Sequence, residues 1–212
     1  MSILPAVGDP LPEASLLAAV EALAAGAVVG IPTDTVYGLA VDPTVPGATD
    51  HLFEAKRRPR EVDLPVLVAN VDQALSLTTA VPAAAKRLMG RYWPGPLTLV
   101  LPRDPSFTAD LGDDEATIGI RCPQHPVPLA LCAKAGPLAT TSANLHGQPT
   151  SETAAEVAEV LGDALALVLD GGPCVGSPST VVDCTGVEPR LLREGRVPWS
   201  EIQASVEATL GE

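Results

Sequence analysis

The sequence predicts a single α/β domain. Its 212 residues are 46% hydrophobic, so the chain can bury one sizeable core. Short apolar, β-branched runs alternate along the chain with stretches of helical period, which is the pattern of an α/β protein. No internal repeat appears, and no linker is long enough to force a domain boundary.

The N-terminal part of the chain predicts an arm, a helix and a buried strand. Residues 1–12 contain Pro and Gly and are expected to form an arm at most. Residues 13–25 have the pattern of an amphipathic helix, and Gly26 follows as its stop signal. Residues 27–31 suit a short buried strand, and Pro32 ends its regular pairing because proline has no N–H to donate.

The polar turn after this strand is the stretch around which the rest of the chain is organised. Thr33, Asp34, Thr35 and Tyr37 lie within five positions, and Gly38 follows. A strand end that delivers several hydroxyl groups before a glycine is a common way to line a ligand site. The alternative is an ordinary turn in which the Thr and Asp side chains bond to the local backbone.

The middle of the chain continues the alternation of helices and strands. A helix is expected at residues 50–56, and Pro59 prevents its continuation, so the cations of residues 56–60 lie at or just beyond its C-terminus. The next expected elements are, in order, a strand at 66–68, helices at 71–77 and 82–92, a rigid Trp-Pro-Gly-Pro turn at 93–96 and a strand at 97–101.

The second half of the chain repeats this pattern with longer loops. An acidic surface loop at 102–116 is followed by a strand at 117–121, a helix at 126–135 closed by Gly136 and a strand at 138–140. A loop rich in hydroxyls and amides comes next, and Thr150 suits the N-cap of a helix at 152–161. The remaining expected elements are strands at 165–169, 180–183 and 190–192 and a helix at 200–210 capped by Ser200.

Charge and composition exclude several classes of protein. The chain has 13 Lys and Arg against 26 Asp and Glu, a net charge of −13 that repels nucleic acid and acidic lipid. Aromatic residues make up 3%, too few for the stacking platforms of single-strand nucleic-acid binders. Four of the 13 cations lie in residues 56–60, so an anionic ligand would need this local cationic pocket. No signal peptide or membrane span is evident, and a cytoplasmic protein is expected.

No metal site is predicted from the cysteines and histidines. The cysteines form no C-x-x-C pair and lie at no metal-ligand spacing from a histidine, so reduced, half-buried thiols are expected at Cys122, Cys132, Cys174 and Cys184. Structural or surface roles are expected for His51, His125 and His146.

Five polar loops interrupt the apolar scaffold, at residues 33–38, 56–59, 117–121, 141–147 and 177–180, and Arg193 follows as a late cation. Each loop alone could be an exposed helix end, a surface charge or an ordinary turn. Together they supply fixed cations and neutral hydrogen-bond donors with few carboxylates. That mixture suits a polyphosphate or carboxylate ligand better than a hydrolytic acid–base pair.

Seven motifs occur in one order: P-T-D-T-V-Y-G-L, K-R-R-P, P-G-P-L-T-L-V, T-I-G-I-R-C-P, T-S-A-N-L-H-G, S-T-V-V-D and L-L-R-E-G. In this order they resemble the YrdC/TsaC family, the L-threonylcarbamoyladenylate synthases, in its short single-domain form. The resemblance implies a YrdC-like twisted, mixed sheet flanked by helices, with a cationic cavity, over residues 13–197. Residues 1–12 would be an N-terminal arm, and residues 198–212 a C-terminal helix packed on the same domain.

The resemblance also implies an activity, the condensation of L-threonine, bicarbonate and ATP into threonylcarbamoyl-AMP with release of pyrophosphate. Partner proteins would then use this adenylate to modify an adenosine of tRNA, and weak or no direct tRNA binding is expected. No protein nucleophile is needed, so catalysis would consist mostly of positioning and charge stabilisation. Mg²⁺ is expected with ATP, held chiefly by ATP and water, because no carboxylate cluster is visible.

Matched motif by motif, the resemblance implies three overlapping sets of site residues. The set expected to act in catalysis is Lys56, Arg58, Ser142 and Asn144. The set expected to bind ATP is Arg58, Thr117, Thr140, Ser142, Thr150 and Arg193. The set expected to bind threonine is Thr35, Arg121 and Ser179.

The chain departs from the family pattern at three positions, and two other functions compete with the synthase. Asp34 stands where members often have Glu, Arg57 adds a cation of unknown use, and Val68 stands where many members have His. The alternatives are a non-catalytic RNA-binding module of the same fold and a carbamoyl-transfer domain like that of HypF. The acidic charge counts against the first, and the lack of a Cys-rich zinc region counts against the second.

Overall fold

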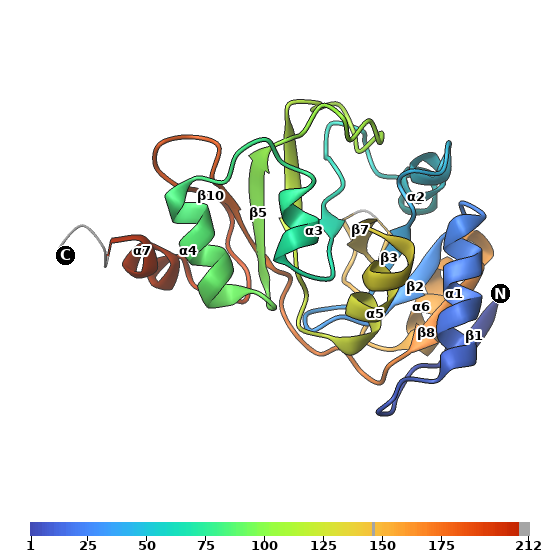
Figure 1. Cartoon of the computed structure of the whole chain (residues 1–212). Coiled ribbons are helices and arrows are strands. Elements are labelled where there is room, and N and C mark those ends of the chain that lie inside the picture. Colours follow the sequence, from blue (N-terminus) through green and yellow to red (C-terminus); the bar gives the residue numbers. More distant parts are fainter. Residues whose placement is uncertain (146, 208–212) are drawn as a thin grey trace.

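The computed structural model describes residues 1–145 and 147–207. Within these residues ten strands form one sheet, in the order β1-β8-β2-β3-β7-β4-β6-β5-β9-β10 (Figure 1). The strands are β1 (Ser2–Pro5), β2 (Val29–Ile31), β3 (Gly38–Val41), β4 (Val66–Leu67), β5 (Leu97–Pro102), β6 (Thr117–Arg121), β7 (Leu138–Ser142), β8 (Leu167–Asp170), β9 (Thr180–Asp183) and β10 (Arg190–Arg193).

The sheet is mixed. Parallel pairs join β1 to β8, β2 to β8, β4 to β6 and β5 to β9, and the other neighbours are antiparallel. The register places Gly38 opposite both Ile31 and Ser142. The turn between β2 and β3 therefore lies beside the C-terminal end of β7, although about a hundred residues separate them in the sequence.

Helices cover the sheet and bury two apolar clusters. They are α1 (Glu13–Ala24), α2 (Ala48–Lys56), α3 (Val71–Leu75), α4 (Ala83–Tyr92), α5 (Pro126–Ala135), α6 (Ala154–Leu161) and α7 (Trp199–Glu207), with a 3₁₀ turn η1 at Gly162–Ala164. One cluster joins α1 and α5 to β2 and β8, and the larger one runs along the rest of the sheet. The α/β fold with a mixed sheet predicted from the sequence is confirmed.

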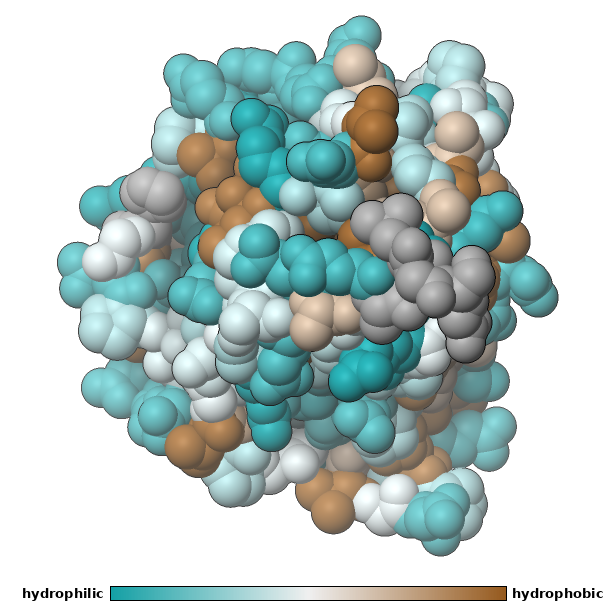
Figure 2. Space-filling model, turned by 90° about the vertical axis from the view of Figure 1, so that its left-hand side faces the viewer, coloured by the Kyte–Doolittle hydropathy of each residue, from teal (hydrophilic) through white to brown (hydrophobic). Residues whose placement is uncertain are grey.

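α4 and α7 pack against each other at the end of the molecule that carries β10 (Figure 1). Seen from this end, the surface is largely hydrophilic, and its apolar atoms lie in separate patches (Figure 2). α7 begins at Trp199, so Ser200 lies inside the helix and does not cap it, and residues 208–212 of the predicted helix lie outside the described residues. Within the described part of the chain no helix is long and apolar enough to cross a membrane.

Two strands were not predicted from the sequence. Residues 2–5, expected to form an arm, form the edge strand β1, which pairs in parallel with β8. β3 follows the polar turn directly and pairs with β2 and β7. Both strands are four residues long, too short for a periodic pattern, and they are held by pairing with distant strands.

α6 begins later than predicted, and Thr153 is its N-cap, not Thr150. The Thr153 Oγ1 accepts a hydrogen bond from the Glu156 N–H at 3.2 Å, and the Glu156 carboxylate accepts one from the Glu152 N–H at 2.7 Å. This reciprocal arrangement satisfies N–H groups that the first turn of a helix leaves without partners.

We expect Thr153→Ala to lower the free energy of unfolding by about 1 kcal/mol, because the substitution removes the N-cap acceptor. Thr150→Ala, three positions earlier, is the matched control and should change it by less than about 0.5 kcal/mol. Urea denaturation of both variants with unchanged m values measures the difference. An equal loss in the two variants would contradict the N-cap assignment.

Candidate functional site

A cavity of about 460 Å³ opens among the strand ends and loops that carry the predicted motifs. Its volume lies within the range of small-molecule sites. Eight of the eleven predicted site residues line it: Thr35, Arg58, Thr117, Arg121, Thr140, Ser142, Ser179 and Arg193. The structure therefore brings together residues from six separate motifs, and leaves Lys56, Asn144 and Thr150 outside the cavity wall.

The polar turn serves both purposes that its sequence suggested. The Thr33 Oγ1 accepts hydrogen bonds from the N–H groups of Thr35 and Val36, at 3.1 and 3.2 Å, and donates to the Val36 carbonyl at 2.6 Å. Thr33 thus shapes the turn. The Thr35 hydroxyl lies 3.0 Å from Thr33 Oγ1 and accepts a hydrogen bond from Arg121, so it belongs to the cavity wall.

Arg121, at the end of β6, is held on three sides. Its Nε donates to the Gly95 carbonyl at 3.0 Å, Nη1 to Thr35 Oγ1 at 3.0 Å and Nη2 to the Asp34 carboxylate at 2.6 Å. The residue is only 7% exposed, and this burial lowers the pKa of the guanidinium, which Asp34 partly offsets. A guanidinium has five N–H groups, so two of them remain for a ligand.

Asp34 is the site residue whose role the sequence did not reveal. Its side chain is 13% exposed and forms a buried ion pair with Arg121, 87 positions further along the chain. The sequence suggests for Asp34 only a contact with the local backbone of the turn. The only sequence signal was a carboxylate between two threonines in the first motif, and a buried counterion cannot be assigned without the contact.

Arg58 and Arg193 supply positive charge without a carboxylate partner in the described part of the chain. Arg58 donates to the carbonyls of Val62 and Asp63, at 2.7 and 2.9 Å, and to Thr141 Oγ1 at 3.3 Å. Burial and the nearby Arg193 lower the pKa of Arg58. Two cations that face one cavity and have only neutral partners favour an anionic ligand.

Ser179 contacts two other residues of the cavity wall, Thr98 and Arg193. Its Oγ lies 2.9 Å from the Thr98 hydroxyl on β5, and its carbonyl accepts a hydrogen bond from Arg193 Nη2 at 2.9 Å. The loop before β9 therefore positions Arg193 through its backbone and presents a hydroxyl group to the cavity.

The prediction that Lys56 and Asn144 contact a ligand directly does not match their geometry. Lys56 is 2% exposed, and its Nζ donates to the Ser142 carbonyl and to two oxygens of Asn144. Asn144 Nδ2 donates to the carbonyls of Leu145 and Gln148. These polar groups are used within the loop after β7.

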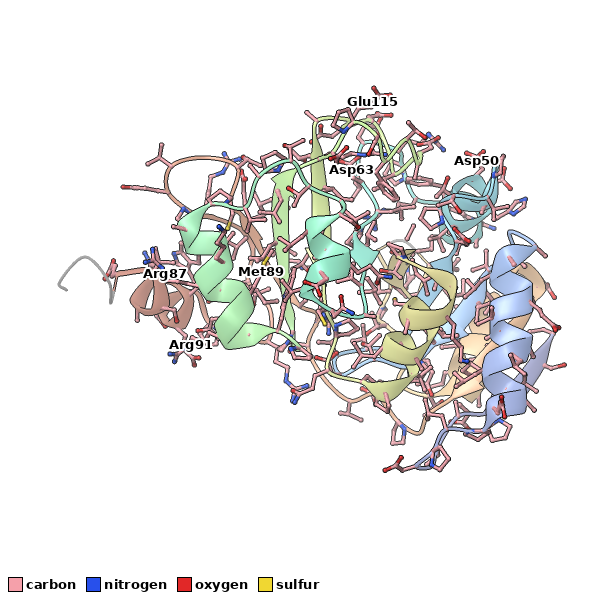
Figure 3. All side chains as sticks on the ribbon, in the orientation of Figure 1. Asp50, Asp63, Arg87, Met89, Arg91 and Glu115 are labelled. Carbon is pink, nitrogen blue, oxygen red and sulfur yellow. The ribbon has the colours of Figure 1, made fainter. Side chains whose placement is uncertain are left out.

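The cavity contains carboxylates on one side, but they do not form a metal site. Glu61, Asp63 and Asp114 line the wall, and the N–H and hydroxyl of Thr117 both donate to Asp114. Asp63 and Glu115 lie at the same edge of the molecule (Figure 3). Among the described residues, no three His, Cys, Asp or Glu side chains are close enough to hold a metal ion.

The remaining predicted positions have structural surroundings. Val68, a departure from the pattern that the resemblance implies, is fully buried in the larger apolar cluster. His51 Nδ1 lies 3.1 Å from the Gly26 carbonyl, and His125 caps α5, whereas His146 lies outside the described residues. The cysteines Cys122, Cys132, Cys174 and Cys184 are free and buried, and burial raises the pKa of each thiol.

The fold and the cavity define a class of protein, an α/β domain with a mixed sheet and a polar cavity whose wall includes three arginines. The chain belongs to the Sua5/YciO/YrdC family, whose sequence profile, described as "Telomere recombination", matches residues 21–195. The family resemblance of the ordered motifs is thus confirmed over most of the chain.

Three relatives illustrate the similarity. A Mycobacterium tuberculosis protein is 40% identical over 188 residues, which cover 88% of this chain and 87% of that one. A Bacillus subtilis protein named threonylcarbamoyl-AMP synthase is 42% identical over 186 residues, 84% of this chain and 53% of its own. The crystal structure of Pyrococcus abyssi Sua5 complexed with L-threonine superposes with a TM-score of 0.89 at 33% identity, covering 98% of this chain and 61% of that one. The chain therefore spans little more than half the length of the last two.

Proposed function

We propose that this protein is an L-threonylcarbamoyladenylate synthase, which condenses L-threonine, bicarbonate and ATP into threonylcarbamoyl-AMP and pyrophosphate. The observation that carries the proposal is one cavity that combines Arg58 and Arg193, free of carboxylate partners among the described residues, with a clamped Arg121. The names of relatives at 36–42% identity and the L-threonine complex of P. abyssi Sua5 support it. The RNA-binding and carbamoyl-transfer alternatives are not favoured.

In this proposal the end of the cavity near Arg121 binds threonine. Two N–H groups of Arg121 remain for the threonine carboxylate, since the other three are already bonded. The hydroxyls of Thr35 and Ser179 lie on the same wall and would orient the amino acid. Asp34 would set the direction of the guanidinium without touching the substrate.

The other end of the cavity would bind MgATP. Arg58 and Arg193 would lie along the phosphates, with the hydroxyls of Thr117, Thr140 and Ser142 around the nucleotide. Threonine and bicarbonate give a carbamate with loss of water, and a carbamate oxygen attacks the α-phosphorus as the bond to pyrophosphate breaks. Negative charge grows on the leaving pyrophosphate, so fixed guanidinium groups stabilise the transition state.

The direct test is incubation of the protein with MgATP, bicarbonate and L-threonine. We expect mass spectrometry to show threonylcarbamoyl-AMP, and a coupled assay to show an equal amount of pyrophosphate. Omission of threonine should stop pyrophosphate release. ATP turnover without threonine would instead favour the carbamoyl-transfer alternative.

We further propose that the protein makes the adenylate without RNA, and that tRNA-modification partner proteins in the cytoplasm use it. Few cations are available for RNA outside the cavity. Arg60 is neutralised by Asp50 and Asp110, whereas Arg87 and Arg91 extend from α4, at the far end of the molecule (Figure 3). The other exposed cations outside the cavity are Arg57, Lys86, Lys134, Arg190 and Arg196, of which Arg190 pairs with Asp183. In a chain with 26 acidic residues, these scattered cations should give little counterion release.

We therefore expect weak tRNA binding, with a Kd no tighter than about 10⁻⁶ M at about 150 mM salt, as for ordinary non-specific binding. A filter-binding titration measures it, with product formation followed in the same preparation. Submicromolar affinity for tRNA without any product from MgATP, bicarbonate and threonine would favour the RNA-binding module.

A further inference from the structure

Lys56 is a buried cation that lies next to the cavity but does not line it. We propose that Lys56 is a positioning residue: its ammonium holds residues 142–144 in the shape that presents Ser142 to the cavity, and it affects the reaction only through that segment. The kinetic part of this inference rests on the proposed function, and the structural part does not.

The hydrogen bonds of Lys56 account for all its N–H groups. An ammonium has three, and Nζ lies 2.6 Å from the Ser142 carbonyl oxygen, 2.7 Å from the Asn144 carbonyl oxygen and 2.8 Å from Asn144 Oδ1, with Ser142 Oγ further away at 3.4 Å. Lys56 is the last residue of α2, which packs against β3 and β7. With three good acceptors in place, no donor remains for a phosphate.

The segment that Lys56 holds also has contacts of its own. The Ala143 N–H, in the middle of the segment, donates to the Tyr37 carbonyl at 2.8 Å, and the Ser151 N–H donates to the Ala143 carbonyl at 3.2 Å. Asn144 Nδ2 donates to the carbonyls of Leu145 and Gln148, and Ser142 Oγ donates to Asn144 Oδ1 at 2.6 Å. Of the three residues of the segment, Ser142 alone lines the cavity.

Among the described residues, no carboxylate forms an ion pair with Lys56. β3, β7 and residues 142–145 carry no ionisable side chain, and Arg58 is the charged group that faces the ammonium. Burial, and then Arg58, lower the pKa of Lys56 to about 8. A neutral amine has two N–H groups and a lone pair, so deprotonation would turn one contact with an oxygen into a repulsion.

Raising the pH should have opposite effects on stability and on activity, and this difference distinguishes the proposed role of Lys56 from general unfolding. Between a pH of about 8 and the ordinary lysine pKa near 10.5, the unfolded chain binds a proton at Lys56 that the folded chain lacks. The contribution of Lys56 to the free energy of unfolding therefore rises with pH in this window, while its hold on residues 142–144 is lost. Activity should fall without loss of fold.

The first experiment uses the wild-type protein, whose three lysines are Lys56, Lys86 and Lys134. With ¹³Cε-labelled lysine, we expect the Lys56 signal to titrate with a midpoint of about 8. Amide shifts of residues 142–144 and the kcat should follow the same midpoint. The proposal is wrong if these amides and kcat do not follow the Lys56 signal.

The second experiment compares Lys56→Met with Arg57→Met, a matched loss of one cation at the neighbouring exposed position. Amide exchange of residues 140–151 should be about ten-fold faster in Lys56→Met and unchanged in Arg57→Met at equal pH. The kcat of Lys56→Met should fall about ten-fold or more, with the Kd for MgATP within about three-fold of wild type.

Two outcomes would overturn the proposal. One is unchanged exchange of residues 140–151 in Lys56→Met. The other is a rise in the Kd for MgATP as large as that in Arg58→Met, which would make Lys56 a phosphate ligand. If the wild-type protein forms no threonylcarbamoyl-AMP at all, the proposed function fails, but the lysine titration and the amide exchange still decide the role of Lys56.

Discussion

Replacing Arg58 by methionine should lower the rate of threonylcarbamoyl-AMP formation by on the order of 10²–10³, the usual loss when one charge partner of a transition state is removed. Arg58 lines the cavity and bonds to two carbonyls and one hydroxyl, and no carboxylate of the described residues forms an ion pair with it. Pyrophosphate release at saturating threonine measures the effect. The Kd for MgATP should rise as well, since the same guanidinium would contact the phosphates in the ground state.

Arg57→Met is the matched control for this variant. Arg57 is exposed and adopts a left-handed conformation with φ of 51° as the C-cap of α2. It adds a cation one position away but does not line the cavity. We expect near wild-type turnover in Arg57→Met. If Arg58→Met also retains near wild-type turnover, the cations that follow α2 are only solvated side chains at a helix end. The assignment of Arg58 to the ATP phosphates is then wrong.

Arg121→Ala should raise the KM for threonine by a factor of ten or more, and raise that for ATP less, because a charged hydrogen bond is worth about 1.5–3 kcal/mol. It should also destabilise the protein, since Asp34 would be left as a buried charge without its partner. Breaking a buried ion pair in this way typically costs about 3–5 kcal/mol. Initial rates at varied threonine and ATP, together with urea denaturation, measure the two effects.

The double variant Asp34→Ala, Arg121→Ala separates the two effects. It removes both charges, so much of the lost stability should return, whereas the KM for threonine should remain high. Asp34→Asn alone should keep the contact to Arg121 but weaken it. An equal rise of both KM values in Arg121→Ala would remove Arg121 from the threonine site.

Much of the architecture could be predicted from local patterns. The elements at residues 117–121, 126–135 and 180–183 have the predicted bounds, because periodic apolar residues and clear stop signals such as Gly136 mark them. β1 and β3 could not be predicted, since each is held by ladders to distant strands. The start of α6 was misplaced because Thr150, Ser151 and Thr153 are all acceptable N-caps, and only the geometry selects Thr153.

The candidate site, like the fold, could be predicted from the sequence only in part. The ordered motifs identified the residue types that line the cavity, among them Arg58, Arg121 and Arg193. They could not tell which polar residues face the cavity and which support it from behind. Lys56 lies two positions from Arg58 in the same motif, yet its ammonium does not line the cavity. It donates instead to the carbonyls of Ser142 and Asn144, which lie 86 and 88 positions further along the chain.

The sequence by itself determined the fold class, the family and the set of polar loops, because these depend on residue type, period and order along the chain. The tertiary structure alone decided that Asp34 is the counterion of Arg121, that Lys56 is bonded on all sides by Ser142 and Asn144, and that Val68 faces the core. Each of these depends on which groups lie within about 3 Å after the sheet has brought together segments far apart in the chain. A buried charge or polar group needs hydrogen-bond or ion-pair partners within this distance, and the local sequence does not show which distant residue supplies them.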